Sequence, residues 1–356
     1  MLRLTCLMLL LTFTAAGGVG HAAARSSPIE AELALPDSLK QMLPAEARDR
    51  RRDEFQRMQA LVKFMVTDNG LGLRYQEQPT YGIEESLEMR RVNCLSFTML
   101  FVAMARASGL NAFAQASDDA LTMRELDGTL YRATHVNAGI EVQDRIYVVD
   151  VGSQAVVVGR RPQRISDART VALLRNNHAV EHLLQGEHAK ADETIHAAIA
   201  LDASNAAIWN NAGVVHWRAG RRDAAERAYL KALKLQRDHV GALSNLVALH
   251  RAGGASEPLA RYEKRLLRAQ ASDPFSQFIV AQSLAVSGAH DAAIAHYQRA
   301  IRLLPGEPQF HRGLAQAYQD QGDAVAAERA RERASRIEAR QASRRRIRDV
   351  GEPGSG

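Results

Sequence analysis

Apolar side chains in the first half of the chain recur at helical spacing. Between Ala45 and Thr67 they return every three or four residues, with arginine and aspartate on the other face, which predicts an amphipathic helix. Thr80 is a suitable N-cap for a shorter helix that ends near Arg90. Residues 95–105 are apolar almost all round, so they predict a buried central helix.

A period of two replaces the helical period further along. Ala133–Val142 alternates between apolar and polar residues, as a strand with one buried face does. A turn at Gln143–Arg145 and a second strand, Ile146–Val149, follow. His135 lies on the first strand and Asp150 follows the second, so a hairpin brings both toward the same open end.

A third period, of 34 residues, governs the second half of the chain. Alanine stands five and twelve positions after every repeating glycine except Gly254, where leucine takes both places. Each unit is expected to be two helices joined by a tight turn, where glycine accepts the backbone conformation. The repeating glycines are Gly186, Gly220, Gly254, Gly288 and Gly322.

This half resembles the tetratricopeptide repeat family, whose helix pairs bury their apolar faces against neighbouring pairs. Residues 166–341 are expected to form an all-α solenoid with a protein or peptide as partner. The five predicted repeats are 172–205, 206–239, 240–273, 274–307 and 308–341.

Chain length and charge limit the number of domains and the class of partner. A chain of 356 residues has room for two domains, and its net charge of +6 is mildly basic. Much of the excess lies in arginines from 329 to 348, which indicates a polar capping helix and then a basic, disordered tail at 342–356. We expect no nucleic-acid partner.

The N-terminus has the pattern of a secretory signal over residues 1–24. A charged start, a short apolar run and the small residues Ala22–Ala24 predict cleavage before Arg25 and export to a periplasm. The apolar run is too short to span a bilayer, so no transmembrane span is expected in the mature chain. The alternative is a signal anchor in the inner membrane.

One cysteine remains after such cleavage, so no internal disulfide is possible. Asn93 is a good N-cap, which places Cys94 in the first turn of the buried helix. The positive end of a helix and a nearby imidazolium both favour a thiolate. His135 is the only histidine between Arg25 and Val171, and Asp150 is placed to orient it.

The stretches around these residues resemble the bacterial transglutaminase-like domains, which share a papain-type cysteine, histidine and aspartate. The similarity covers roughly residues 80–152, and Val136 and Val151 replace an aromatic residue and a proline common in the family. It implies an α+β fold at 25–165, with Cys94 as nucleophile, His135 as general base and Asp150 as its partner. The Cys94 N–H and a donor from Gln76, Gln78 or Tyr81 are candidates for the oxyanion site.

Two functions follow from these features. The first is a cysteine-dependent acyl-transfer or amide-hydrolysing domain joined to a protein-binding array, with no cofactor. The alternative is a scaffold in which a degenerate transglutaminase-like domain only binds. The sequence leaves open the substrate, the partner, the oligomeric state and whether the domain is an enzyme.

Candidate binding residues also follow the 34-residue register. Asn177, Asn211 and Asn245 are expected on the first helix of their repeats at the edge of the concave groove, where amides pair with peptide backbone. Trp217 and Phe278 are candidate anchors, with packing between helices as the alternative. His178 and His182 have i, i+4 spacing, but the register explains His182 and we expect no metal.

Overall fold

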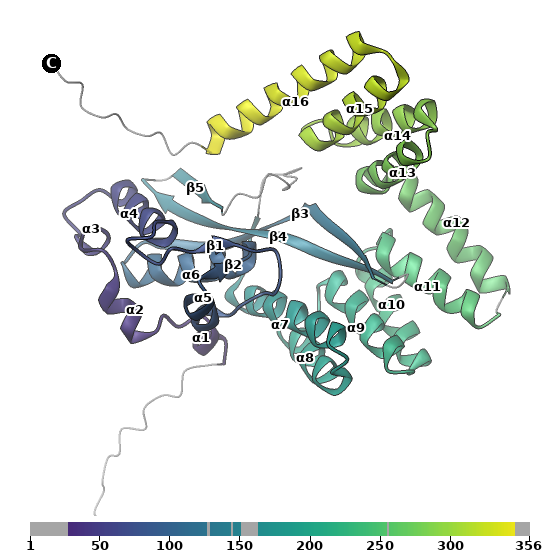
Figure 1. Cartoon of the computed structure of the whole chain (residues 1–356). Helices are drawn as coiled ribbons and strands as arrows, with labels where there is room; N and C mark the ends of the chain where they lie inside the picture. The colour runs from purple at the N-terminus through teal and green to yellow at the C-terminus, as the bar shows by residue number, and fades with distance from the viewer. Residues whose placement is uncertain (1–27, 127–128, 144, 151–162, 255, 346–356) are drawn as a thin grey trace, which may run out of the picture.

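The computed structural model describes residues 28–126, 129–143, 145–150, 163–254 and 256–345. Helices and a sheet come first along the chain, and an array of helices follows (Figure 1). The predicted order of a mixed first part and an all-α second part is therefore present.

The first part is built on a four-stranded antiparallel sheet with the order β5-β4-β3-β6. A separate parallel pair joins β1 to β2 just before the cysteine helix. The strands are β1 (Arg74–Tyr75), β2 (Arg91–Val92), β3 (Asn111–Leu126), β4 (Thr129–Val142), β5 (Arg145–Val149) and β6 (Gln163–Arg164). The helices are α1 (Pro28–Glu32), α2 (Asp37–Met42), α3 (Ala45–Arg48), α4 (Glu54–Val66), α5 (Ile83–Met89) and α6 (Cys94–Ala107).

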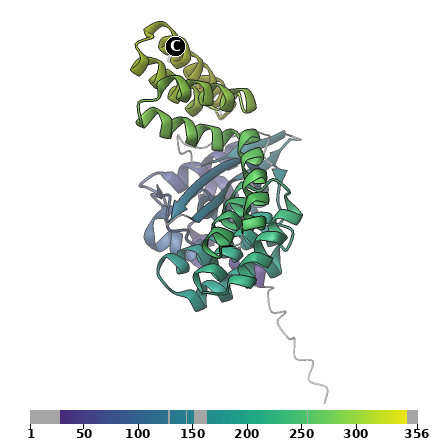
Figure 2. The ribbon, with the colours of Figure 1, turned by 90° about the vertical axis from the view of Figure 1, so that its right-hand side faces the viewer.

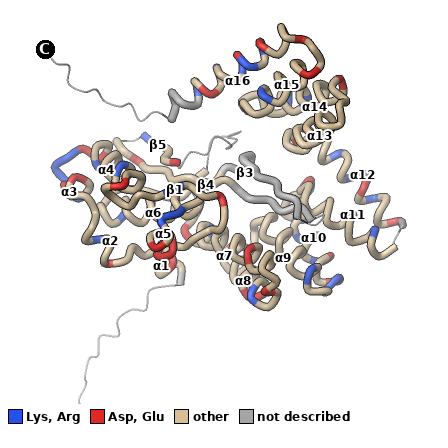
Figure 3. Tube along the Cα trace, viewed as in Figure 1, with Lys and Arg blue, Asp and Glu red and all other residues tan. Residues whose placement is uncertain are grey.

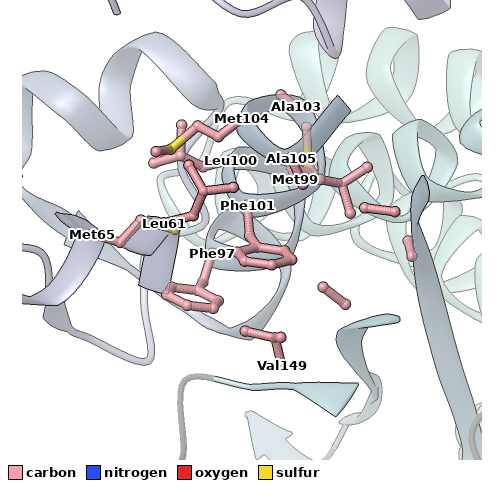
Figure 4. Packing of buried hydrophobic residues seen from close by; sticks show 14 of the residues in the cluster. Leu61, Met65, Phe97, Met99, Leu100, Phe101, Ala103, Met104, Ala105 and Val149 are labelled. Atoms are coloured by element: carbon pink, nitrogen blue, oxygen red, sulfur yellow. The ribbon is translucent and has the colours of Figure 1, made fainter. Parts of the chain in front are cut away.

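Helix α6 is the centre of the first hydrophobic core, as its sequence predicts. Every residue from Leu95 to Ala105 is buried. Phe97 and Phe101 stack with ring centroids 6.4 Å apart, and α4 contributes Leu61 to the same cluster (Figure 4). Burying this many apolar groups is the main force that holds α6 between α4 and the sheet.

Two predicted helix starts differ from the structure. The helix expected over 45–67 is split into α3 and α4, because the Asp53 carboxylate accepts the Gln56 N–H and caps a new helix. The helix expected from Thr80 begins at Ile83, where Glu85 bonds back to the Gly82 N–H. Thr80 is left free for contacts outside its own segment.

The second part consists of five helix pairs, one in each predicted repeat. All five repeating glycines have positive φ, from +69° to +93°, as the tight turn requires. The pairs are α7 (Asp167–Leu184) with α8 (His188–Leu201), α9 (Ala206–Arg218) with α10 (Arg222–Leu235), α11 (Val240–Ala252) with α12 (Ser256–Ser272), α13 (Pro274–Val286) with α14 (His290–Leu303), and α15 (Pro308–Gln321) with α16 (Ala324–Arg345).

The array is not one continuous core. Buried apolar residues of α7–α12 form one cluster, and those of α13–α16 form two smaller clusters of their own. The long α12 leads from one group to the other, and α13–α16 stand apart from the first helices (Figures 1 and 2). The last two repeats therefore present separate surfaces.

The β3–β4 hairpin runs from the first part to the repeats. Strand β4 packs against α6 at one end and lies beside α9 and α11 further along (Figure 1). Since α9 and α11 are the first helices of their repeats, a strand of the same chain covers part of the surface expected to hold a partner.

At the two ends of the chain, the sequence predicts a signal at 1–24 and a basic tail at 342–356. The predicted signal over 1–24 lies outside the described residues. Among the helices that the structure describes, none is long and apolar enough to cross a membrane. Helix α16 continues to Arg345, past the predicted start of the tail at residue 342. It carries both acidic and basic side chains (Figure 3). Residues 346–356 are not among the described residues.

Gly213 lets α9 and α10 approach closely, and this gives a test of the repeat core. A Cβ at this position would lie 2.3 Å from Cε1 of Tyr229, whose side chain is only 2% exposed. We expect Gly213→Ala to lower the free energy of unfolding by about 1–3 kcal/mol, because the buried ring has to move. Urea unfolding followed by circular dichroism measures the change.

Gly306→Ala is the matched control, because an added Cβ there meets no atom within 4 Å. Equal stability of the two variants would contradict this account of the α9–α10 contact.

Candidate functional site

Cys94 is the first residue of α6, as the sequence predicts. The Asn93 side chain accepts the Ser96 N–H at 2.9 Å and caps the helix. The Thr98 hydroxyl donates to the Cys94 carbonyl oxygen at 2.7 Å. The thiol is half-buried and is in no disulfide.

His135 and Asp150 come together through the hairpin. Ala138 pairs with Val149, so Asp150 falls opposite Asn137 and on the same face as His135. Nε2 of His135 lies 2.8 Å from Oδ2 of Asp150. The register between β3 and β4 shifts beside His135, and such irregularities often re-aim a side chain next to a site.

The Cys94 side chain also lies close enough to the imidazole to affect its pKa. Burial disfavours the charged ring, which is 8% exposed, but the hydrogen bonds and charges of Asp150 and Cys94 outweigh it and raise the pKa of His135 to about 9. The imidazolium is thus the main form at neutral pH.

The three residues lie in the order that a nucleophile, a proton carrier and an orienting carboxylate would need. The Asp150 carboxylate on Nε2 holds the His135 ring in one orientation. The arrangement suits attack on a carbonyl carbon followed by proton delivery to a leaving group.

The candidate oxyanion donors are partly engaged elsewhere. The Tyr81 N–H donates to the Ser96 hydroxyl at 2.9 Å, and the Gln76 side chain donates to the Gln78 carbonyl. The Cys94 N–H lies in the first turn of α6, where backbone donors have no partner within the helix. It is the best placed of the predicted donors.

The asparagines of the repeats lie on α7, α9 and α11 as predicted, but not at an open groove. Asn211 is 2% exposed and donates to Oδ1 of Asn176 at 2.9 Å. Asn245 is 4% exposed and donates to Oδ1 of Asn210 at 3.0 Å. These amides link one repeat to the next, beside the hairpin that covers α9 and α11. Peptide binding by Asn177, Asn211 and Asn245 stays a prediction.

Asn177 differs from the other two because its partner is in the first part. Its Nδ2 donates to the Thr80 hydroxyl oxygen at 3.2 Å. Glu181 also bonds to Thr80, at 2.7 Å. No spacing pattern in the sequence predicts this contact, because about 100 residues separate the partners.

The predicted aromatic anchors take part in packing. Trp217 packs against the cluster of α7–α12 and keeps part of its surface exposed. Phe278 is half-buried, with ring centroids 5.7 Å from Tyr297 and 5.0 Å from Phe310. Both therefore contribute to the helix contacts, and their exposed portions are what a partner would meet.

The two histidines of the predicted i, i+4 pair are engaged with protein groups. His178 bonds to the Thr80 carbonyl at 3.0 Å, and His182 lies 2.7 Å from a Glu187 carboxylate oxygen. These contacts account for the predicted i, i+4 pair without a metal.

The described residues hold one cluster with metal-ligand atoms close together, namely Asp192, His196 and His216. The Arg221 guanidinium contacts both Asp192 and His216, the latter at 3.0 Å. Burial and the Arg221 charge lower the pKa of His216. Since the Arg221 guanidinium already bonds to two of the three side chains, we assign no metal to this cluster.

Comparisons with known proteins agree with the helical half. Residues 206–239 match the family model described as Tetratricopeptide repeat, and residues 282–322 match a second model described as TPR repeat. The first match coincides with the predicted second repeat. The tetratricopeptide prediction is therefore confirmed for this half. None of the curated proteins matches the chain.

Solved structures similar to this chain cover about half of it. A crystal structure of MamA is 17% identical, with a TM-score of 0.29, over 46% of this chain and 96% of that one. MamA from Desulfovibrio magneticus RS-1 is 18% identical, with a TM-score of 0.27, over 48% and 96%. YrrB, a TPR protein with an unusual peptide-binding site, is 19% identical, with a TM-score of 0.26, over 49% and 89%.

Proposed function

We propose that residues 25–165 form a cysteine-dependent acyl-transfer or amide-hydrolysing domain that resembles the transglutaminase-like family. The observation that supports the proposal is the proximity of Cys94, His135 and Asp150: the ring bonds to Asp150 and interacts with the Cys94 side chain at the start of a buried helix. Their order and neighbours in the sequence single out the same three residues, and a nucleophile, a base and an orienting group in mutual reach are what an active site requires.

In this proposal the Cys94 sulfur attacks the carbonyl carbon of an amide. The C–N bond breaks, the imidazolium of His135 gives its proton to the leaving nitrogen, and a thioester remains on the sulfur. Water or an amine then attacks the thioester, His135 removes the proton of the attacking group, and the thiolate is restored. Asp150 keeps the ring in place throughout.

The repeats supply the protein-binding part of this proposal. A solenoid offers an extended surface for a protein or peptide, and the partly exposed Trp217 and Phe278 are candidate contacts. The proposal places the mature chain in a periplasm, with a signal anchor in the inner membrane as the alternative. Because β4 covers α9 and α11, a partner would use the remaining surface or displace the strand.

The direct test is the reactivity of the thiol. In full-length protein without its signal, we expect iodoacetamide to alkylate Cys94 at pH 7 at least about tenfold faster than it alkylates free cysteine, because the imidazolium and the helix end favour the thiolate. His135→Ala should reduce the rate to that of an ordinary half-buried thiol. Intact-mass spectrometry follows the reaction, and Cys94→Ala serves as the unlabelled control.

A wild-type rate no faster than that of free cysteine would contradict the catalytic proposal. The scaffold function, with a degenerate domain that only binds, would then describe the protein.

A further inference from the structure

The segment between β1 and α5 is attached to the first helix of the repeats through Thr80, which is 4% exposed. Its backbone N–H donates to a Glu181 carboxylate oxygen at 2.7 Å. Its carbonyl oxygen lies 3.0 Å from Nε2 of His178. Its hydroxyl oxygen accepts from the Asn177 amide at 3.2 Å. Three neighbouring side chains on α7 therefore hold one residue of the first part.

The same threonine holds the residue that caps the cysteine helix. Nδ2 of Asn93 donates to the Thr80 hydroxyl oxygen at 2.9 Å, while Oδ1 of Asn93 accepts the Ser96 N–H. The Thr80 hydroxyl oxygen also accepts from Asn177 on α7, while the Thr80 N–H is held by Glu181. The Asn93 amide is thus engaged at both atoms: its oxygen bonds to α6, and its nitrogen bonds to Thr80, which the repeats hold.

We propose that Thr80 and Glu181 are positioning residues through which the first repeat sets the orientation of Asn93 and of the adjacent Cys94. This inference rests on the proposed function, because the group that is positioned is the proposed nucleophile. It makes the first tetratricopeptide repeat part of the catalytic unit in addition to its role in binding.

Thr80 can affect Cys94 because the Asn93 side chain caps α6 only in one orientation of its amide. An Asn amide that loses its Nδ2 partner can rotate about its terminal torsion, and its hold on the Ser96 N–H then weakens. The first turn of α6 carries the sulfur, and displacements of about 1 Å in a reacting group cost large factors in rate. Glu181 acts one step further away, because its carboxylate accepts from the backbone N–H of Thr80.

A second contact between the two parts provides a matched control. Arg106, near the other end of α6, forms a bidentate ion pair with Asp167 at 2.7 and 2.9 Å. Asp167→Asn weakens the attachment of α7 to α6 without touching Thr80 or Asn93. A loss of interface stability alone would therefore affect this variant as much as the Thr80 and Glu181 variants.

The experiment measures Cys94 alkylation by iodoacetamide between pH 6 and 10 in the full chain. Thr80→Val keeps the shape but removes the hydroxyl, and we expect a rate about five- to tenfold lower at pH 7, the effect of one neutral hydrogen bond. Thr80→Ser should restore the rate to within about twofold. Glu181→Gln should lower it about threefold, and Asp167→Asn should leave it unchanged.

Hydrogen–deuterium exchange separates this inference from the proposed function. Thr80→Val and Glu181→Gln should speed exchange in the first turn of α6 relative to wild type, and Asp167→Asn should not. This readout remains valid if wild-type Cys94 is unreactive, in which case only the catalytic proposal fails. If a folded Thr80→Val or Glu181→Gln variant exchanged the amides of that turn as slowly as wild type does, the positioning role would be overturned.

Discussion

Replacing Cys94 by Ala is expected to abolish acyl transfer from an activated ester. Wild-type protein should release nitrophenolate from p-nitrophenyl acetate in a burst equal to the number of active sites, with an acetyl group left on the sulfur. The variant has no sulfur to accept the acyl group, so the burst should vanish and kcat/KM should fall at least about 1,000-fold. Stopped-flow absorbance and intact-mass spectrometry measure both.

His135→Ala should give an intermediate result, a loss of about 100- to 10,000-fold, because the proton carrier is removed while the sulfur remains. Adding an amine such as glycine ethyl ester then shows whether water or the amine resolves the thioester. Cys94→Ala should melt like wild type in circular dichroism, since Cys94 is only half-buried; the same melt checks that His135→Ala, which removes a buried ring, is folded at the assay temperature. A burst that persists in Cys94→Ala would place the nucleophile elsewhere.

The second prediction concerns Asp150 and the charge on His135. In Asp150→Asn the buried ring loses the carboxylate that helps to raise its pKa to about 9. Burial is then opposed mainly by Cys94, so we expect the pKa to fall by two or more, toward or below the ordinary value of about 6.5. NMR titration of the His135 ring protons, assigned with the His135→Ala spectrum, measures the change.

The same shift links stability to pH. Because the folded-state pKa of His135 lies above the unfolded value of 6.5, protonation stabilises the folded state. This contribution is complete below about pH 6.5 and is lost as pH rises through about 9. The difference between these two pKa values corresponds to about 3 kcal/mol in the free energy of unfolding. Urea unfolding at pH 6 and pH 10 should show this loss in wild type and little of it in Asp150→Asn; equal losses would contradict the assignment.

Local features of the chain were predictable because they depend on short-range chemistry. The 34-residue glycine period predicted five helix pairs, and five pairs are present with their glycines at positive φ. Asn93 predicted a cap, and α6 begins at Cys94. Thr80 shows the limit of such signals, because a good capping residue can bond elsewhere when another segment offers better partners.

Periodicity was enough to predict the helices and strands, and the only cysteine and histidine of the first domain were enough to select the candidate triad. The contact of Thr80 with α7 and the position of β4 beside α9 and α11 appear only in the folded chain. These contacts join segments far apart in the chain, and they depend on the relative placement of two cores, which no local pattern encodes.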